Sequence, residues 1–145
     1  MKNAKELLKE FTAASFRDPK KAAEMFAEDG AFEMPYLESF GVQGRYEGRE
    51  AIEAFFRFVR GIYLDMDLEN VKVMIETPEQ AFAEYGFTAR SSKTGRTIHE
   101  LLFGRLVAEN GKIKLLRESV NLVEIALGLF PNGLADYKAP AEHAA

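Results

Sequence analysis

The chain has 145 residues, 47% of them hydrophobic, which is enough for one domain with a packed core. Nineteen basic and twenty-three acidic residues give a net charge of −4, so the composition offers no basic surface for nucleic acid. Because cysteine is absent, disulfides, thiolate nucleophiles and cysteine-based zinc sites are excluded. No apolar run approaches a membrane span, and the N-terminus lacks the apolar block of a signal peptide. We therefore expect a cytoplasmic protein without membrane or nucleic-acid partners.

Two helices are predicted at the start of the chain. Apolar residues recur at helical spacing between residues 3 and 17. Asp18 and Pro19 then supply an N-cap and a first-turn proline for a second helix, and Gly30 is expected as its left-handed C-terminal residue. We expect the two helices to pack as a hairpin.

A short strand and a third helix follow. Residues 31–36 are predicted as the strand, and an irregular stretch with several glycines comes after it. Residues 49–60 restart the helical period with Phe55 on the apolar side, and Gly61 is expected to end this helix.

The second half of the chain is predicted to form antiparallel strands. The strand candidates are residues 71–76, 81–90, 97–108 and the stretch 111–121, which leads into an amphipathic run over 122–129. Asn110 and Gly111 are a strong hairpin signal. Gly86 and Gly104 lie inside two long strands, where glycine is typical of a bend, so the sheet is predicted to be strongly curved.

Helices followed by a meander of strands indicate the α+β class. We expect a conical barrel, in which a strongly curved mixed or antiparallel sheet carries three N-terminal helices over its concave face. No linker or repeat divides the chain, so residues 1–130 are predicted as a single domain. Residues 131–145, rich in Ala and Pro, are predicted as a loosely attached C-terminal extension.

Glu118 is the main candidate for chemistry. Alternation on the last strand places it on one face with Leu116 and Val120. An apolar environment raises the pKa of a carboxyl, which lets it donate and recover a proton near neutral pH. The alternative is a strand carboxylate at a wet sheet edge, or one paired with a neighbouring arginine.

Further candidates would surround a ligand. His99, on the same strand face as Leu101 and Phe103, could lie near Glu118 and hold a proton or a ligand carbonyl, or it could be a surface residue near a strand end. Tyr36 could offer a hydroxyl at the pocket mouth, or lie on the rim. The aromatic residues predicted to line the cavity, with core packing as the alternative, are Phe11, Phe16 and Phe55.

Metal and cofactor sites are not expected. The two histidines lie far apart and no ordered carboxylate cluster accompanies them, so no metal ligand set is apparent. The glycines at 41, 44 and 48 do not have the spacing of a dinucleotide or phosphate-binding loop.

The last strand also bears on assembly. Ile113 and Leu115 are predicted on the face opposite Glu118, so the outer face of the sheet would be partly apolar. Such a surface predicts a homodimer through the convex sheet face.

Several blocks of the sequence resemble the nuclear transport factor 2-like superfamily, and within it the SnoaL-like, polyketide cyclase-like branch. The superfamily blocks are EMFAEDGAF at 24–32 and YEGREAI at 46–52, followed by a sheet that ends in GKI at 111–113. The likeness is closest to the phenazine-biosynthesis A/B proteins, through NVKVMIET at 70–77, ENGKI at 109–113 and RESVNL at 117–122. It covers about residues 5–130.

The resemblance implies a ligand pocket between sheet and helices, dimerisation through the outer sheet face, and an acid/base role for Glu118. Some family positions differ here. The aspartate base of ketosteroid isomerases corresponds to Met34, and their oxyanion tyrosine to Phe11. The partner histidine of the phenazine proteins corresponds to Phe55 or Phe56.

Two main hypotheses follow for a small hydrophobic ligand. The leading one is a cofactor-free acid/base enzyme, such as a cyclase, isomerase or condensing enzyme, acting on a hydrophobic cyclic carbonyl compound of secondary metabolism. The alternative is a non-catalytic ligand-binding or dimeric scaffold domain. A dehydratase or epoxide hydrolase ranks lower, because no Asp–Arg–Asp set is apparent on the sheet. Whether Glu118 faces a cavity or bulk water separates the first two hypotheses.

Overall fold

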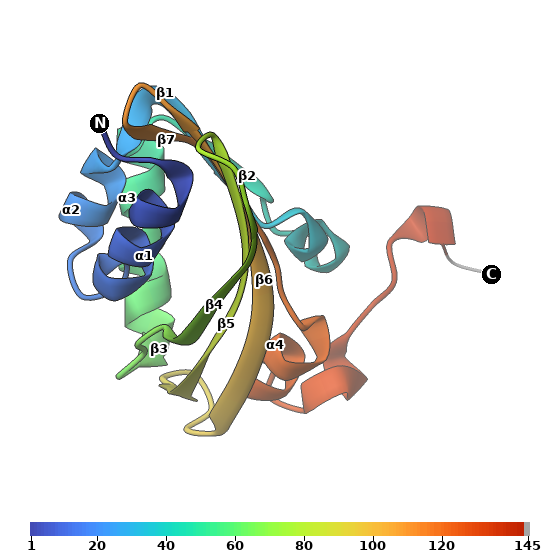
Figure 1. Ribbon diagram of the computed structural model, residues 1–145. Helices are drawn as coiled ribbons and strands as arrows, with labels where there is room; N and C mark the ends of the chain where they lie inside the picture. Colours follow the sequence, from blue (N-terminus) through green and yellow to red (C-terminus); the bar gives the residue numbers. More distant parts are fainter. Residues whose placement is uncertain (144–145) are drawn as a thin grey trace.

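The computed structural model describes residues 1–143 and contains one curved mixed sheet that forms a half-barrel (Figure 1). The helices are α1 (Ala4–Ala14), α2 (Pro19–Glu24), α3 (Arg49–Ile62) and α4 (Leu122–Leu129), with 3-10 segments η1 (Pro35–Phe40), η2 (Gly133–Asp136) and η3 (Ala141–His143). The strands are β1 (Phe26–Glu33), β2 (Arg45–Glu47), β3 (Tyr63–Leu64), β4 (Glu69–Glu76), β5 (Gln80–Ser91), β6 (Thr97–Glu109) and β7 (Lys112–Ser119). Helices α1 to α3 lie together on the concave side of the sheet, which confirms the predicted fold class (Figure 1).

The first two helices begin at side-chain caps. The Asn3 side chain accepts a hydrogen bond from the Glu6 backbone at 3.0 Å, and the Glu6 carboxylate accepts one from the Asn3 backbone at 2.9 Å. This capping box satisfies two backbone donors that the first turn leaves free. Helix α2 begins as predicted, because Asp18 accepts from the Lys21 N–H at 3.0 Å and Pro19 occupies the first turn.

Two predictions for the next segment are wrong. Helix α2 ends at Glu24, so Gly30 is not its C-terminal residue and lies instead within β1. A Cβ at Gly30 would come within 2.7 Å of the Ile113 carbonyl oxygen, so the glycine permits close approach of β7. Strand β1 also begins at Phe26, earlier than predicted, because it pairs in parallel with β7 through a register shift before Ala31. Local alternation does not reveal such a tertiary pairing.

Helix α3 occupies the predicted segment but runs further. Gly61 does not end it, because the helix continues through Ile62 and passes directly into β3. Ile52, Phe55 and Phe56 are buried along its inner side, which turns the apolar stripe toward the sheet.

The sheet has the order β2-β1-β7-β6-β5-β3, and β4 also pairs with β5. The pairing of β1 with β7 is parallel and all others are antiparallel. Asn110 and Gly111 have φ angles of 51° and 73°, so they form the predicted tight turn between β6 and β7. The β5–β6 ladder runs without a register shift through both Gly86 and Gly104. A Cβ at Gly86 would lie 2.5 Å from the Glu100 carbonyl oxygen, so this glycine permits a close approach between strands.

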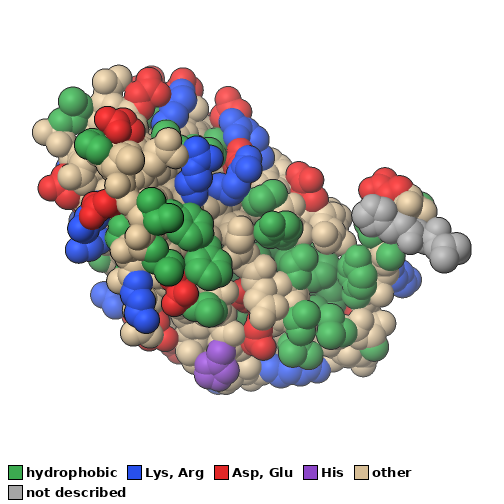
Figure 2. All heavy atoms as spheres, turned by 45° about the vertical axis from the view of Figure 1, so that its right-hand side comes forward, with side chains coloured by type: hydrophobic (Ala, Val, Ile, Leu, Met, Phe, Trp, Pro, Cys, Tyr) green, Lys and Arg blue, Asp and Glu red, His purple; other side chains and the backbone are tan. Residues whose placement is uncertain are grey.

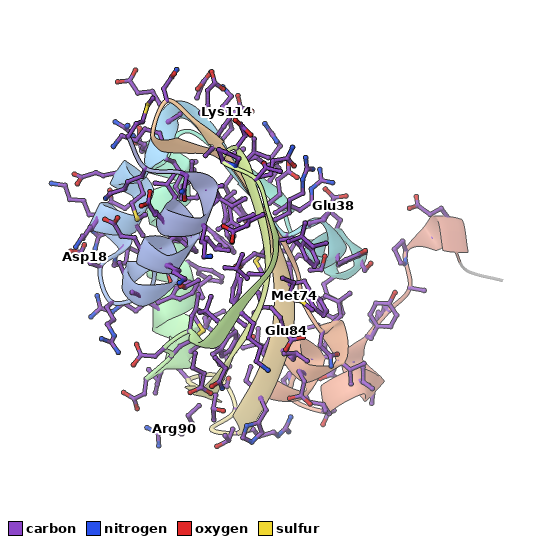
Figure 3. All side chains as sticks on the ribbon, viewed as in Figure 1. Asp18, Glu38, Met74, Glu84, Arg90 and Lys114 are labelled. Carbon is purple, nitrogen blue, oxygen red and sulfur yellow. The ribbon has the colours of Figure 1, made fainter. Side chains whose placement is uncertain are left out.

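The two faces of β6 differ in burial. Even-numbered residues from Ile98 to Leu106 point inward and are buried, whereas Leu101 and Phe103 are exposed on the convex side. The inner face packs on a group of phenylalanine rings in mutual contact, and Figure 3 shows side chains filling the space between the sheet and α1–α3. The fully buried members of this group are Phe11, Phe26, Phe32 and Phe56.

The prediction that Ile113 lies on the outer face is wrong. Ile113 is fully buried in the core. Leu116 and Glu118 are buried as well, although strict alternation would place them on the opposite face from Ile113. The pairing of β6 with β7 shifts register between Val107 and Ala108, and this irregularity changes which residues of β7 face inward. Ile113 therefore adds nothing to an outer apolar surface.

Helix α4 covers an open part of the sheet. Strand β7 ends opposite Phe103, which leaves the first half of β6 without a strand neighbour on that side. There the His99 backbone N–H donates to the Glu124 carboxylate of α4 at 3.2 Å. Beyond the helix, Tyr137 packs on Phe40 of η1 with ring centroids 5.8 Å apart, so the segment after residue 130 still contacts the body. The division into a domain over 1–130 and an extension stays a prediction.

Candidate functional site

A cavity of about 340 Å³ lies between the sheet and the elements that cover it. The sheet contributes Phe32, Phe87 and Leu102 to its wall, and α3 contributes Phe55 and Val59. Residues of η1 and α4 complete the wall, which is almost entirely apolar. The volume falls at the lower end of the range of small-molecule sites, about 300–1,000 Å³.

Only a few polar side chains reach this cavity: Tyr63, Lys93, Glu100 and Glu118. Glu118 is 4% exposed and lines the cavity rather than the outer surface. In the described part of the chain its one side-chain hydrogen bond comes from the Tyr85 hydroxyl to Oε2. Its other carboxylate oxygen is therefore free for a ligand.

Gly104 makes the contact between Tyr85 and Glu118 possible. Tyr85 lies on β5 and Glu118 on β7, on opposite sides of β6, and Gly104 is the β6 residue paired with Glu118. A Cβ at Gly104 would lie 2.2 Å from the Tyr85 hydroxyl oxygen. Any side chain there would collide with the tyrosine, so the glycine opens the path by which its ring crosses β6.

Burial sets the protonation behaviour of this pair. Desolvation raises the pKa of Glu118 from 4.5 to about 7, while the hydrogen bond from Tyr85 works in the opposite direction. Desolvation and the nearby carboxylate raise the pKa of the fully buried Tyr85 well above its usual value. Tyr85 therefore stays a neutral donor, and Glu118 can both hold and release a proton near neutral pH.

Glu100 is a second buried carboxyl in the cavity that the sequence reasoning missed. It is 5% exposed, and desolvation is the main cause that raises its pKa to about 7. Its neighbours on the same face of β6 are Ile98 and Leu102, both buried. The signal was therefore the same as for Glu118: an acid between two apolar residues at strand spacing.

Two buried polar atoms of residues that line the cavity have no partner within residues 1–143. They are the Tyr63 hydroxyl oxygen and Oε2 of Glu100, and both residues are buried. Oε1 of Glu100 accepts a hydrogen bond from the Asn121 backbone N–H, so only one of its oxygens is unpaired. An unpaired buried polar atom costs stability, about 1–3 kcal/mol, unless a ligand or water satisfies it.

The predicted lining aromatics separate into two groups. Phe16 and Phe55 line the cavity, and their contact with a ligand stays a prediction. Phe11 does not line it, because the ring is fully buried in the core against Phe26 and Phe56. Its position on the first helix places it behind the cavity wall.

Neither Tyr36 nor His99 lines the cavity, so of the two alternatives for each residue the structure favours a rim position for Tyr36 and a surface position for His99. Tyr36 is 54% exposed and is not part of the cavity wall, because its neighbour Leu37 takes the inward position on η1. His99 is exposed on the outer face of β6, where its Nδ1 lies 3.0 Å from the Thr88 hydroxyl oxygen. The face of β6 that carries His99 and Leu101 points away from the cavity.

Glu33 is engaged outside the cavity. It forms ion pairs with Arg45 and Arg117, and the bond from Arg117 is 2.5 Å long. Although burial acts to raise the pKa of Glu33, the two guanidinium groups lower it overall. Glu33 therefore joins β1 to its two neighbouring strands.

Among the described residues there is neither a cluster of metal-ligating side chains nor a membrane-spanning helix. Within residues 1–143, no group of three or more acidic or histidine side chains is placed to hold a metal ion. No helix in that range is long and apolar enough to cross a membrane.

Solved structures with the same fold include three from bacteria. A putative isomerase from Bacillus subtilis is 24% identical, with 86% of this chain and 92% of that chain covered and a TM-score of 0.74. A phenazine biosynthesis-related protein from Pseudomonas aeruginosa is 16% identical, with 97% and 87% covered and a TM-score of 0.77. A putative polyketide cyclase from Pseudomonas putida is 18% identical, with 89% and 99% covered and a TM-score of 0.74.

The TM-scores show that these three proteins share the fold of this chain, and at such low sequence identities the likeness shows the fold alone. No curated protein matches the chain. The family model of the SnoaL-like domain matches residues 8–116, which is most of the chain. The match begins within α1 and ends within β7. The matched segment ends two residues before Glu118. The chain belongs to the SnoaL-like domain family, within the nuclear transport factor 2-like fold.

Proposed function

We propose that the protein is a cofactor-independent acid/base enzyme that acts on a hydrophobic cyclic carbonyl compound, with Glu118 as its proton acceptor and donor. The observation that carries this proposal is a buried carboxyl with a pKa of about 7 on the wall of an apolar cavity. Cyclisation, isomerisation and condensation all require removal or return of a proton on carbon beside a carbonyl group. A base whose pKa lies near the working pH suits that step.

Two groups would share the work. The ionised Glu118 would take the proton with the oxygen that Tyr85 does not occupy, while the Tyr85 hydroxyl stabilises the other oxygen. The aromatic wall would exclude water and hold the ring of the ligand, since the cavity is lined by Phe32, Phe55 and Phe87. The names of the structural relatives, a putative isomerase and a putative polyketide cyclase, agree with this class of reaction.

Deuterium exchange tests the proposal without knowledge of the natural substrate. The cyclic ketone 1-tetralone is incubated with the protein in heavy water, and loss of its α-protons is followed by NMR. We expect wild type to accelerate the exchange and Glu118→Gln to remove the acceleration while still binding the ketone. Equal rates for the two proteins would overturn the role of Glu118.

A ligand-binding domain without chemistry is the second candidate. The described cavity wall contains no histidine, and the resemblance to the phenazine-biosynthesis proteins implies that Phe55 or Phe56 stands in place of their partner histidine. Without that second group, Glu118 would act as a hydrogen-bond partner for a bound ligand. This candidate predicts binding of the ketone with no exchange in either protein.

We also propose a homodimer formed through the convex sheet face. Phe82 and Phe103 stack there at 5.7 Å with an interplanar angle of 6°, and both remain partly exposed beside the 58% exposed Leu101. Figure 2 turns this side of the molecule forward and shows hydrophobic side chains gathered between charged ones. Light scattering of wild type should give twice the monomer mass, and Leu101→Lys should lower it. A wild-type monomer at micromolar concentration would contradict the proposal.

A further inference from the structure

The unpaired atoms of Tyr63 and Glu100 mark a second polar position in the cavity. Both side chains line the cavity and are more than nine-tenths buried, yet neither atom has a hydrogen-bond partner within the described chain. Buried polar groups are nearly always paired, so two unpaired polar atoms on residues that line the same cavity point to a polar ligand group there. The mechanism proposed for Glu118 does not use either residue.

This second position is distinct from the Glu118 end of the cavity. Glu100 pairs with Phe87, and Tyr63 packs on the same Phe87 ring at 5.6 Å. Glu118 is opposite Gly104, four residues further along β6, which is about 13 Å of strand. Burial is the main cause of the raised pKa of Glu100, and the charge of Glu118 adds to it.

The hydrogen-bonding capacity of the two atoms determines which ligand group they could bind. Burial and the charge of Glu100 raise the pKa of the Tyr63 hydroxyl, so it remains a hydrogen-bond donor. Glu100 is neutral or ionised near pH 7, and its unpaired oxygen therefore donates or accepts according to the pH. A ligand hydroxyl can accept from Tyr63 and either accept from or donate to Glu100, which suits both states.

We propose that Tyr63 and Glu100 bind a hydroxyl group of the ligand, so that the protein takes a hydroxylated cyclic ketone whose carbonyl end lies at Glu118. The proposal rests on the cavity being the ligand site named above and extends it to the substrate class. In this proposal Tyr63 and Glu100 bind and orient the ligand, and Glu118 lies beside the carbon next to the carbonyl.

Three matched ketones test this inference by calorimetry: 1-tetralone, 6-hydroxy-1-tetralone and 6-methoxy-1-tetralone. Wild type should bind the hydroxy compound roughly threefold to tenfold more tightly than 1-tetralone, since one or two net hydrogen bonds are gained. The methoxy compound should lose this advantage, because it cannot donate and is larger. Tyr63→Phe should also remove the advantage while leaving the affinity for 1-tetralone within about twofold.

Three further variants distinguish the proposed hydroxyl site from the Glu118 site and from the protein surface. Glu100→Gln keeps an amide in place, so it should retain the advantage in part and abolish its dependence on pH around 7. Tyr36→Phe is the matched control, because this tyrosine is exposed and outside the cavity wall, and it should behave as wild type. Glu118→Gln should keep the preference for the hydroxyl even though exchange is lost.

Three kinds of failure are distinguishable. An unchanged preference for the hydroxy compound in Tyr63→Phe and Glu100→Gln, or no preference in wild type, overturns the inference and leaves the role of Glu118 standing. Failure of all three ketones to bind wild type contradicts the proposed ligand site and this inference together. If wild type does not accelerate exchange but still prefers the hydroxy compound, only the proposed chemistry is contradicted.

Discussion

Replacing Glu118 by glutamine should make the protein more stable at alkaline pH. In the folded protein the pKa of Glu118 is raised from 4.5 to about 7, because the carboxyl is buried. The folded state therefore binds this proton more tightly than the unfolded chain does. Its contribution to stability is fully present below the unfolded pKa and is lost as the pH rises through the folded pKa.

The size of this effect follows from the shift. Two to three pKa units correspond to about 3 kcal/mol of unfolding free energy lost between about pH 4.5 and pH 7. The glutamine side chain of the Glu118→Gln variant would have no charge to bury and would still accept the hydrogen bond from Tyr85. We therefore expect wild type and Glu118→Gln to be equally stable at about pH 4 and the variant to be about 3 kcal/mol more stable at about pH 8.

Urea unfolding at a series of pH values measures this difference directly. Glu100 titrates in both proteins, and burial and the charge of Glu118 both raise the pKa of Glu100, so the difference between the two curves reports Glu118 together with its effect on Glu100. The same substitution at Glu84, on the outer face of β5, controls for the loss of one carboxylate from the protein. Parallel curves for wild type and Glu118→Gln between pH 5 and pH 8, or a variant less stable than wild type at pH 8, would refute the assignment of a buried, proton-holding carboxyl.

Three other substitutions test single contacts. Gly104→Ala places a methyl group on the Tyr85 hydroxyl and should cost about 2 kcal/mol in urea unfolding, and a neutral effect would contradict the described path of Tyr85. Tyr63→Phe removes an unpaired buried hydroxyl and should leave stability unchanged or raise it by about 1 kcal/mol, whereas a loss of stability would mean that the hydroxyl is satisfied. Glu33→Gln should cost about 1–2 kcal/mol at pH 7. Since the folded pKa of Glu33 is lowered, this cost should vanish as the pH falls through that value, and a cost independent of pH would argue against the ion pairs.

Alternation identified Glu118 because its two neighbours on the same face, Leu116 and Val120, are apolar. The same rule applied to β6 would have found Glu100 between Ile98 and Leu102. His99 is the rarer residue type and was the predicted site residue on this strand, but its face points outward. Periodicity tells which residues share a face, but it does not tell which face is inside when both carry apolar residues.

Other features depend on tertiary contacts that local patterns do not contain. The burial of Ile113 follows from a register shift in the β6–β7 pairing, and a shift of one residue exchanges the faces of a strand. The early start of β1 follows from parallel pairing with β7. The role of Gly104 follows from the diagonal reach of Tyr85 across β6, where the sequence alone suggests a bend.

The pH dependence of deuterium exchange into 1-tetralone tests the central claim most directly. If Glu118 is the base, the exchange rate in the presence of wild-type protein should rise with pH and level off above an apparent pKa of about 7. Glu118→Gln should show only the exchange seen in buffer. A wild-type profile with no inflection near pH 7, or one shared by Glu118→Gln, would contradict the claim that this carboxyl transfers protons to a ligand.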